Sequence, residues 1–385
     1  MSDEYEKIKV IGCSEQGGIR GAQLWGVYQN EELRSTFQTQ PGNDYWSSWS
    51  GLWKPNSPNG ISALTACKQN NGEVQLWAIT PDGVLHSICQ NSPGGGWSEW
   101  TSNWNDAPNF DCIVACEQGG ERGAQFWGVD TEGILRSCFQ ITPGGEWSSW
   151  SGNWHGNSPE GIMQLTACRQ SNGLVQLWAL TKDGEVYNTS QTSPGGGWTS
   201  WISNWNNVPE LTHITACEQD GNQGIRFWGI DKNAKMGSCY QESKGGKWTA
   251  WQLLWTPNPH FISPKNVIQI ASCLQNDGKA QLWALLRNGE LMTTYQTGPT
   301  NWYQWFTMYP ITAGGMVSIH YNWGDNVNFD NLETLQRIDA MLPNSDYFWA
   351  QEFHFGEGNG GYMGLQGNAE IRSKEEKQKI VIFSI

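Results

Sequence analysis

The sequence predicts an all-β protein, a six-bladed β-propeller of four-stranded blades with pseudo-threefold symmetry (three double blades), followed by a small C-terminal α/β segment. The first observation behind this prediction is a repeated unit. It starts with Cys-x-Gln or Cys-x-x-Gln and contains one central tryptophan. The central tryptophans lie 50 to 55 residues apart: Trp25, Trp77, Trp127, Trp178, Trp228 and Trp283. A fixed period of this length is typical of propellers and stacked repeats.

The second observation is an aromatic signature, Trp-x-x-Trp-x-x-x-Trp, that closes each copy. The six closing triplets are Trp46/Trp49/Trp53, Trp97/Trp100/Trp104, Trp147/Trp150/Trp154, Trp198/Trp201/Trp205, Trp248/Trp251/Trp255 and Trp302/Trp305/Tyr309. Together with the central residues they account for 23 of the 25 tryptophans. Because a blade must bury both of its faces against its neighbours, we expect the central tryptophan and the first of each triplet to form the core between blades.

The third observation is the local pattern within one copy. Side chains alternate with a period of two in residues 123–129, which indicates a β-strand rather than a helix. Turn signals follow at residues 131–133 and 143–145. Each copy therefore has room for four short strands joined by tight turns, which is one propeller blade.

The copies also alternate in sequence. Odd copies carry Gln-Gly-Gly-x-Arg-Gly-Ala before the central tryptophan, at residues 16–22 and 118–124, and the fifth copy has a divergent version at residues 219–224. Even copies are one residue shorter at this place, as in residues 69–72. The alternation predicts three double blades and two kinds of boundary between blades.

The repeat stops after residue 310. We therefore expect two parts, a propeller over residues 1–310 and a C-terminal segment over residues 311–385. This segment is interpreted either as a cap or as a truncated second domain, the beginning of an effector domain. The spacing of leucine and isoleucine predicts a helix over residues 331–342. Residues 359–366 and 381–385 are predicted to be strands.

Composition and charge restrict the partners. The net charge is −14 and no basic run is present, which argues against nucleic acid and anionic membranes. No apolar run approaches the roughly 20 residues of a membrane span, so membrane insertion is not expected. The first six residues lack the basic end and apolar core of a secretory leader. They predict a cytoplasmic protein or one that is released without a classical signal peptide.

Ten cysteines could suggest disulfides, but their placement does not. One cysteine recurs at nearly the same place in every copy: Cys13, Cys67, Cys116, Cys168, Cys217 and Cys273. We expect equivalent positions in successive blades to be too far apart for a bridge. These residues are therefore interpreted as small buried thiols that pack a strand.

The repeat unit resembles known lectin blades. Gln-Leu-Trp-Ala, Asp-Gly-x-Leu, a strand glutamine and Pro-Gly-Gly-Gly-Trp-x-x-Trp are similar to motifs of tectonin-type β-propeller lectins and of PLL-type fucose-binding bacterial lectins. The resemblance covers about 300 of the 385 residues. It implies a closed propeller that binds sugars, often fucose or O-methylated sugars, in crevices between blades. The PLL-type ring has seven blades, whereas six repeats are counted here. The segment Gly-Gly-Tyr-Met-Gly-Leu-Gln resembles, more weakly, the start of a bacterial domain of unknown function.

The candidate ligand-binding residues are aromatic and cationic. An exposed indole stacks on the C–H face of a sugar, and nearby arginine side chains bind its hydroxyl groups. The candidates are Trp49, Trp53, Trp100, Trp104, Trp150, Trp154, Trp201, Trp205, Trp251, Trp255, Arg20, Arg122, Arg34 and Arg136. The alternatives are inter-blade packing for the tryptophans and solvated charge for the arginines. The strand glutamine of each copy is expected to bond backbone groups rather than a ligand.

The predicted function is a multivalent carbohydrate-binding lectin whose partners are glycans or glycoconjugates on cell surfaces, and the sequence leaves open whether it forms a homo-oligomer. A protein-interaction propeller without sugar binding is the alternative. A glycosidase needs two carboxylates about 5–9.5 Å apart, which the tail would have to supply through residues such as Glu352 or Glu357. Acidic residues of the array are scattered in turns, so no enzyme activity is expected. The six histidines share no repeat position, and no metal or cofactor is predicted.

Overall fold

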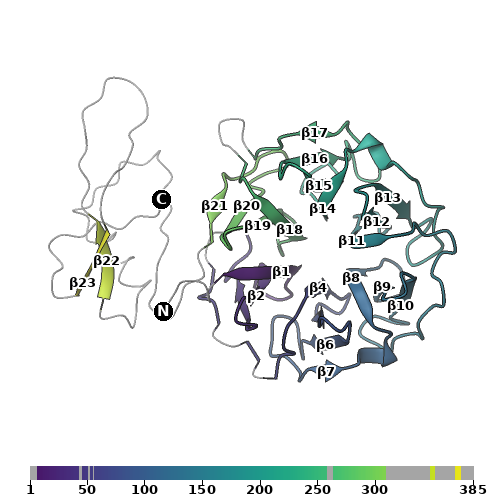
Figure 1. Ribbon diagram of the computed structural model, residues 1–385, viewed down its shortest axis with the longest axis horizontal. Helices are drawn as coiled ribbons and strands as arrows, with labels where there is room; N and C mark the ends of the chain where they lie inside the picture. The colour runs from purple at the N-terminus through teal and green to yellow at the C-terminus, as the bar shows by residue number, and fades with distance from the viewer. Residues whose placement is uncertain are drawn as a thin grey trace. The chain divides into compact units, whose positions relative to one another are not determined.

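The protein is described by a computed structural model. The structure describes residues 7–42, 46–50, 53–54, 56–257, 263–308, 347–351 and 369–373. The chain separates into two compact units, residues 1–308 and 309–385, which are considered one at a time. The first unit is a ring of six antiparallel sheets, and this confirms the predicted six-bladed β-propeller (Figure 1).

The blades follow one another along the chain. Blade 1 contains β1 (Ile8–Glu15), β2 (Ala22–Tyr28) and β3 (Leu33–Phe37), and blade 2 contains β4 (Ala63–Lys68), β5 (Val74–Ile79), β6 (Leu85–Cys89) and β7 (Thr101–Ser102). Blade 3 contains β8 (Phe110–Glu117), β9 (Ala124–Asp130) and β10 (Leu135–Phe139), and blade 4 contains β11 (Ile162–Arg169), β12 (Val175–Thr181) and β13 (Val186–Ser190). Blade 5 contains β14 (Leu211–Glu218), β15 (Ile225–Asp231), β16 (Met236–Tyr240) and β17 (Gln252–Leu253). Blade 6 contains β18 (Val267–Leu274), β19 (Ala280–Leu286), β20 (Leu291–Tyr295) and β21 (Phe306–Thr307).

The outermost strand of every blade is irregular because polar side chains replace part of its backbone ladder. In blade 1 the outer segment pairs with β3 through the bridge between Gln38 and Trp46, and its Ser47 Oγ accepts a hydrogen bond from the Phe37 N–H at 3.1 Å. The same bridge recurs in all six blades. A regular fourth strand is therefore present only in blades 2, 5 and 6 among the described residues.

The blade has two ends that matter for the site. The hairpin end carries the turn between the first and second strands, residues 16–21 in blade 1, and the turn from the third strand to the outer segment. The linker end carries the turn between the second and third strands, residues 29–32 in blade 1, and the connection to the next blade. The second strand spans seven residues in blade 1, which separates the two ends by about 20 Å.

The second strand of each blade forms the centre of the core. Its central tryptophan is fully buried in all six blades, with 0% exposed surface. This confirms the expectation from the sequence. Both faces of this strand are covered, since each blade lies between two neighbours, and the strand is buried along its length in blades 1, 2, 3 and 6.

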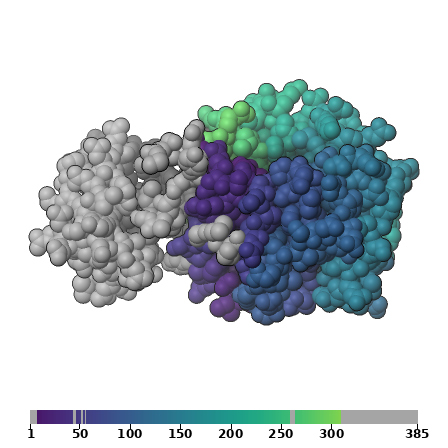
Figure 2. Space-filling view, turned by 60° about the horizontal axis from the view of Figure 1, so that its bottom comes forward, coloured from purple at the N-terminus to yellow at the C-terminus, as the bar shows by residue number. Residues whose placement is uncertain are grey.

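The ring closes between blade 6 and blade 1 without an exchanged strand. The Ile11 N–H donates to Oε1 of Gln269 at 3.0 Å, and Nε2 of Gln269 donates to the Ile11 carbonyl at 3.1 Å. Figures 1 and 2 show the purple first blade beside the green last blade. One glutamine amide thus joins residues that are 258 positions apart in the chain.

The pseudo-threefold alternation appears in the linkers. After even blades the chain forms short 3-10 turns, η2 (Trp104–Asp106) and η3 (Trp205–Asn207), each entered through a left-handed asparagine. After the third tryptophan, Asn105 and Asn206 donate to carbonyl groups of the next blade, to Ser148 and Thr249. After odd blades the same tie is made by Lys54 in blade 1 and by His155 in blade 3.

The second unit is described only through one hairpin, β22 (Tyr347–Gln351) paired antiparallel with β23 (Ala369–Ser373). Neither strand was predicted from the sequence. The predicted helix at 331–342, the predicted strands at 359–366 and 381–385, and Tyr309, Glu352 and Glu357 lie outside the described residues. In the described part of the chain, no helix is long and apolar enough to cross a membrane.

Candidate functional site

The third tryptophan of each triplet lies between its own blade and the next one. The ring centroid of Trp154 lies 5.9 Å from that of Trp127 in blade 3 and 5.2 Å from that of Trp198 in blade 4, both edge to face. The same cross-boundary contact is made by Trp53 with Trp97, Trp104 with Trp147, Trp205 with Trp248 and Trp255 with Trp302. These indoles therefore fill the boundary near the linker end.

The second tryptophan of each triplet faces the preceding blade. Trp100, Trp150 and Trp201 lie 6.2 to 6.4 Å from the third tryptophan of that blade. Trp49, Trp205 and Trp255 are buried, and the other predicted tryptophans, Trp53, Trp100, Trp104, Trp150, Trp154, Trp201 and Trp251, are half-buried. The structure thus brings the ten predicted tryptophans together in the boundaries, where they already contact other aromatic rings, which are Tyr28 for Trp49 and Phe227 for Trp251. Sugar stacking on these residues stays a prediction.

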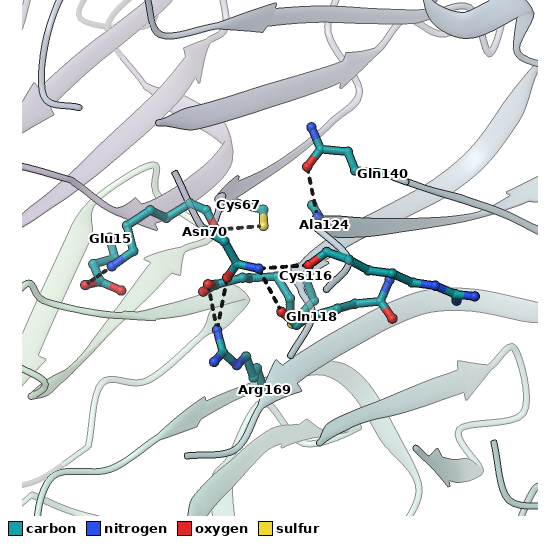
Figure 3. Close-up of polar contacts among 11 residues, drawn as sticks. Glu15, Cys67, Asn70, Cys116, Gln118, Ala124, Gln140 and Arg169 are labelled. Carbon is teal, nitrogen blue, oxygen red and sulfur yellow. Dashed lines mark hydrogen bonds and ion pairs between the residues drawn. The ribbon is translucent and has the colours of Figure 1, made fainter. Parts of the chain in front are cut away.

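The strand glutamine of each copy bonds the backbone, as expected from the sequence. Oε1 of Gln140 accepts a hydrogen bond from the Ala124 N–H at 3.0 Å, and the equivalent bond is present in all six blades. Nε2 of Gln140 reaches across the boundary to Oε1 of Gln69 in blade 2, at 3.0 Å. Figure 3 shows Gln140 above Ala124. The amides of Gln38, Gln90, Gln140 and Gln191 join neighbouring blades in this way, whereas Nε2 of Gln241 donates to the Gly246 carbonyl within blade 5.

This glutamine also explains a glycine in the odd copies. A Cβ atom on Gly123 would lie 2.2 Å from Oε1 of Gln140, and one on Gly21 would lie 2.2 Å from Oε1 of Gln38. Only glycine leaves room for the amide at this place. The Arg-Gly pair of the odd copies therefore places an arginine directly before a position that must be glycine.

Two of the predicted arginines lie at the hairpin end, at the boundary between an odd blade and the following even blade. The guanidinium carbon of Arg20 lies 3.9 Å above the centroid of the Phe37 ring, and that of Arg122 lies 4.0 Å above the Phe139 ring. Both arginines are half-buried. Neither guanidinium group makes a hydrogen bond or an ion pair with the described residues. Burial lowers the pKa of Arg20.

The neighbouring even blade covers these arginines with a glycine-rich turn. A Cβ atom on Gly195 would lie 3.6 Å from Cδ of Arg122, and it would also lie 3.0 Å from the Gly119 carbonyl oxygen. Gly195 adopts a φ of 65°, so both the conformation and the close approach favour glycine. The turn of blade 4 therefore packs against the arginine while presenting backbone rather than charged side chains.

Blade 5 places an arginine on the equivalent ring by a different route. Its turn carries Gln223 where Arg20 and Arg122 lie in blades 1 and 3, and its second strand carries Arg226. The guanidinium carbon of Arg226 lies 4.6 Å from the Tyr240 ring centroid, and Tyr240 is the counterpart of Phe37. All three odd blades thus hold a guanidinium group over the ring that ends the third strand.

Arg226 is much more enclosed than the other two arginines. Its side chain donates to Oε1 of Gln219 at 2.8 Å and to Oγ of Ser238 at 3.1 Å. Burial lowers its pKa to about 10. Arg226 and the three rings were not among the residues predicted from the sequence. The prediction compared equivalent positions of the repeats, and Arg226 does not occupy the position of Arg20 and Arg122.

The other two predicted arginines lie at the linker end and are paired with acids. Arg34 bonds Glu32 at 2.7 Å and lies 4.4 Å from the Tyr28 ring, at the boundary with blade 6. Arg136 bonds Asp130 at 2.5 Å and donates to the Gly152 carbonyl at 2.9 Å. The structure therefore separates Arg34 and Arg136 from Arg20 and Arg122 by the length of a blade.

A cavity of about 420 Å³ runs along the ring axis and is lined by the six inner strands. Its polar side chains mostly join neighbouring blades. Thr65 accepts from the Ala115 N–H at 3.1 Å, Gln164 exchanges two bonds with Ile214, and Thr215 bonds Ser272 at 2.8 Å. Because these groups are already satisfied, the axial cavity is a weaker candidate for a ligand site than the boundaries.

Charged side chains end the inner strands at the hairpin end. Lys68 bonds Glu15 at 2.5 Å and Arg169 bonds Glu117 at 2.6 Å, each across an odd–even boundary (Figure 3). Asn70 adds bonds to the carbonyl groups of Gln118 and Arg122. Burial raises the pKa of Glu15, and the nearby Lys68 opposes this shift. These ion pairs hold the blades in position.

The ten cysteines are all free thiols. Seven are buried, and Cys13, Cys89 and Cys273 are half-buried. Burial raises the pKa of Cys116 to about 12, so this thiol stays protonated at neutral pH. Four of the six repeated cysteines are buried, as interpreted from the sequence. Cys13 and Cys273 are half-buried and their side chains interact, so the expectation that equivalent positions are held apart fails at the boundary between blades 6 and 1. In the described ranges, no group of three or more His, Cys, Asp or Glu side chains is arranged to hold a metal ion.

The sequence matches no protein-family model and no curated protein sequence. Solved structures with a similar fold include proteins that are described as lectins. AofleA from Arthrobotrys oligospora is 14% identical, with a TM-score of 0.58 over 79% of this chain and 88% of that one. The BP39L lectin from Burkholderia pseudomallei is 16% identical, with a TM-score of 0.55 over 78% and 84%.

A third similar structure is the fucose-specific lectin from Aleuria aurantia, which is 13% identical with a TM-score of 0.54 over 81% of this chain and 98% of that one. A further structure of this lectin is described as a six-bladed β-propeller with a novel mode of fucose recognition. At this level of identity the likeness concerns the fold. It shows that the chain shares the propeller architecture of these structures.

Proposed function

We propose that the protein is a multivalent carbohydrate-binding lectin that takes sugars at the boundaries between its blades. The observation that carries this proposal is the arginine held over an aromatic ring at the hairpin end of blades 1 and 3, Arg20 on Phe37 and Arg122 on Phe139. A ring supplies an apolar face for sugar C–H groups, and a guanidinium group supplies hydrogen-bond donors for sugar oxygen atoms. The fold is the one found in the fucose-specific lectin from Aleuria aurantia.

Fucose or O-methylated sugars are the proposed ligands, because they combine hydroxyl groups with a methyl group that an aromatic ring can contact. Repetition around the ring suits weak single sites. Several sites on one molecule raise the overall affinity for a sugar-coated surface without any new contact. The proposal includes no catalytic step. The proposed partners are glycans on cell surfaces, met by a protein that stays in the cytoplasm or leaves it without a classical signal peptide.

A glycan array followed by calorimetry with methyl α-L-fucoside tests the proposal. The informative variant replaces both rings, Phe37→Leu with Phe139→Leu, and we expect it to lose about tenfold or more in affinity, since about 1.4 kcal/mol corresponds to a factor of ten. Cys89→Ala is the matched control because Cys89 occupies the same place in an even blade. Its binding should be unchanged. Absence of binding to every glycan on the array would exclude a lectin and favour a protein-interaction propeller.

A further inference from the structure

The two arginines at the hairpin end, Arg20 and Arg122, differ from Arg34, Arg136 and Arg169 in what they contact. Arg34, Arg136 and Arg169 each bond a carboxylate at 2.5 to 2.7 Å. Arg20 and Arg122 are half-buried on phenylalanine rings, and within the described part of the chain their guanidinium groups have no acidic partner. The five N–H donors of each group are therefore available to a ligand.

The lack of an acid is informative in this particular chain. It carries 37 acidic residues against 23 basic ones, so carboxylates outnumber cations by 14. A single nearby substitution to aspartate or glutamate would be enough to pair a half-buried arginine with an acid. Desolvation of an unpaired charge is unfavourable, and burial lowers the pKa of Arg20 as a result. Binding of an anion to the guanidinium group would offset this cost of desolvating the unpaired charge.

The turns of blades 2 and 4 that face the two arginines carry no charged side chain. The opposing turns of blades 2 and 4 read Asn-Ser-Pro-Gly-Gly-Gly and Thr-Ser-Pro-Gly-Gly-Gly at residues 91–96 and 192–197. They contain no carboxylate that would repel an anion. The corresponding turns of odd blades carry acidic residues, such as Glu146 and Glu242, and these lie at the other kind of boundary. The boundaries that contain Arg20 and Arg122 therefore have turns without acidic residues, and the other kind of boundary has turns with acidic residues.

From this arrangement we infer that the boundaries at Arg20 and Arg122 bind a sugar that carries an oxyanion, a sulfate ester or a carboxylate, with the guanidinium group on the anion and the phenylalanine ring against the sugar. A planar guanidinium group offers two parallel N–H donors that match such an oxyanion. The inference rests on the proposed lectin function and names the ligand class of these two sites. Blade 5 is not a third equivalent, because the donors of Arg226 are directed to Gln219 and Ser238.

Calorimetry on the full chain with three probes tests the inference. They are methyl α-L-fucoside, its sulfate ester and methyl α-D-galacturonide. We expect the two anionic sugars to bind at least about tenfold more tightly than the neutral fucoside, in line with the energy of charge-assisted hydrogen bonds. The expected stoichiometry is two per chain, and the affinity should fall as salt is raised. Binding of the sulfate ester alone, or of the uronide alone, identifies the source of the oxyanion and supports the inference.

The decisive variant is Arg20→Gln with Arg122→Gln. Glutamine is the residue that blade 5 already has at this place, so the substitution is compatible with the fold. It should abolish the preference for anionic sugars. The charge-matched control is Lys182→Gln with Arg287→Gln, which removes two exposed cations from turns at the linker end and should leave the preference intact.

Two results would overturn the inference. If the double glutamine variant lost neutral and anionic sugars to the same degree, the arginines would serve hydroxyl groups and the lectin function would stand without the anionic class. If none of the three probes bound and the glycan array were also blank, the proposed function itself would be excluded. Circular dichroism and the thermal midpoint of each variant establish that the fold is retained in every comparison.

Discussion

The strand glutamines that bond across a blade boundary, such as Gln140, give the sharpest test of how the blades are held together. In Gln140→Leu two buried groups lose their partners, the Ala124 N–H and Oε1 of Gln69, and both bonds are 3.0 Å long in the structure. Gln140 is 2% exposed, so water cannot replace either bond without local opening. A buried group left unpaired costs about 1–3 kcal/mol. We therefore expect the free energy of unfolding to fall by roughly 3 kcal/mol.

Gln125→Leu is the matched control in the same blade. Gln125 is equally buried, at 3%, but its amide makes one bond, to Oγ of Ser137 at 2.8 Å. Ser137 keeps its own bond to the Phe126 carbonyl at 2.8 Å after the change. The expected loss is about 1 kcal/mol. Reversible urea unfolding followed by tryptophan fluorescence measures both variants. Equal losses would refute the idea that the cross-boundary bond matters more than a bond within one blade.

Four further outcomes follow from the structure. Trp154→Ala should lower the free energy of unfolding by about 3–5 kcal/mol, and unchanged stability would mean that the indole does not pack between blades. Native protein should react rapidly with Ellman's reagent at no more than the three half-buried cysteines, whereas ten fast thiols would contradict the burial. Burial lowers the pKa of His213 and so favours its neutral form in the folded protein. This histidine is therefore compatible with full stability above its unfolded pKa, and stability is lost as the pH falls below that value. His213→Asn should flatten this loss as the pH falls below about 6.5 in thermal scans. Gln223→Arg with Arg226→Gln should convert blade 5 into the arrangement of blades 1 and 3 and raise the stoichiometry for an anionic sugar from two to three.

The fold could be predicted from the sequence because one blade cannot bury its own faces. Each central tryptophan needs a neighbour on both sides, so its recurrence at 50 to 55 residues specifies both the unit and the ring. The alternation of Arg-Gly turns with shorter turns likewise anticipated the two kinds of linker, with asparagine ties after even blades and Lys54 or His155 after odd ones. The hairpin of β22 and β23 was missed because no repeat or turn signal marks it.

The candidate site was only partly predictable, because a repeat shows where residues are equivalent and not which way they point. Arg20 and Arg34 both recur in blade 3, yet the blade carries them at opposite ends, and only the structure shows that Arg34 already has an acid. The triplet tryptophans present the same difficulty. An indole that stacks on a sugar and one that packs against the next blade have the same spacing in the chain.

Arg226 shows the limit of positional reasoning most directly. Blade 5 has no arginine in its turn but has one, Arg226, in the strand that follows. Its guanidinium group lies over Tyr240, as that of Arg20 in blade 1 lies over the equivalent ring, Phe37. What the odd blades share is therefore a contact rather than a position in the alignment of repeats. Phe37, Phe139 and Tyr240 recur at one position, where blades 2 and 4 have Cys89 and Ser190 and blade 6 has Tyr295. The ring is the fixed part of the arrangement, and the arginine above it is the part that differs in enclosure from one boundary to the next.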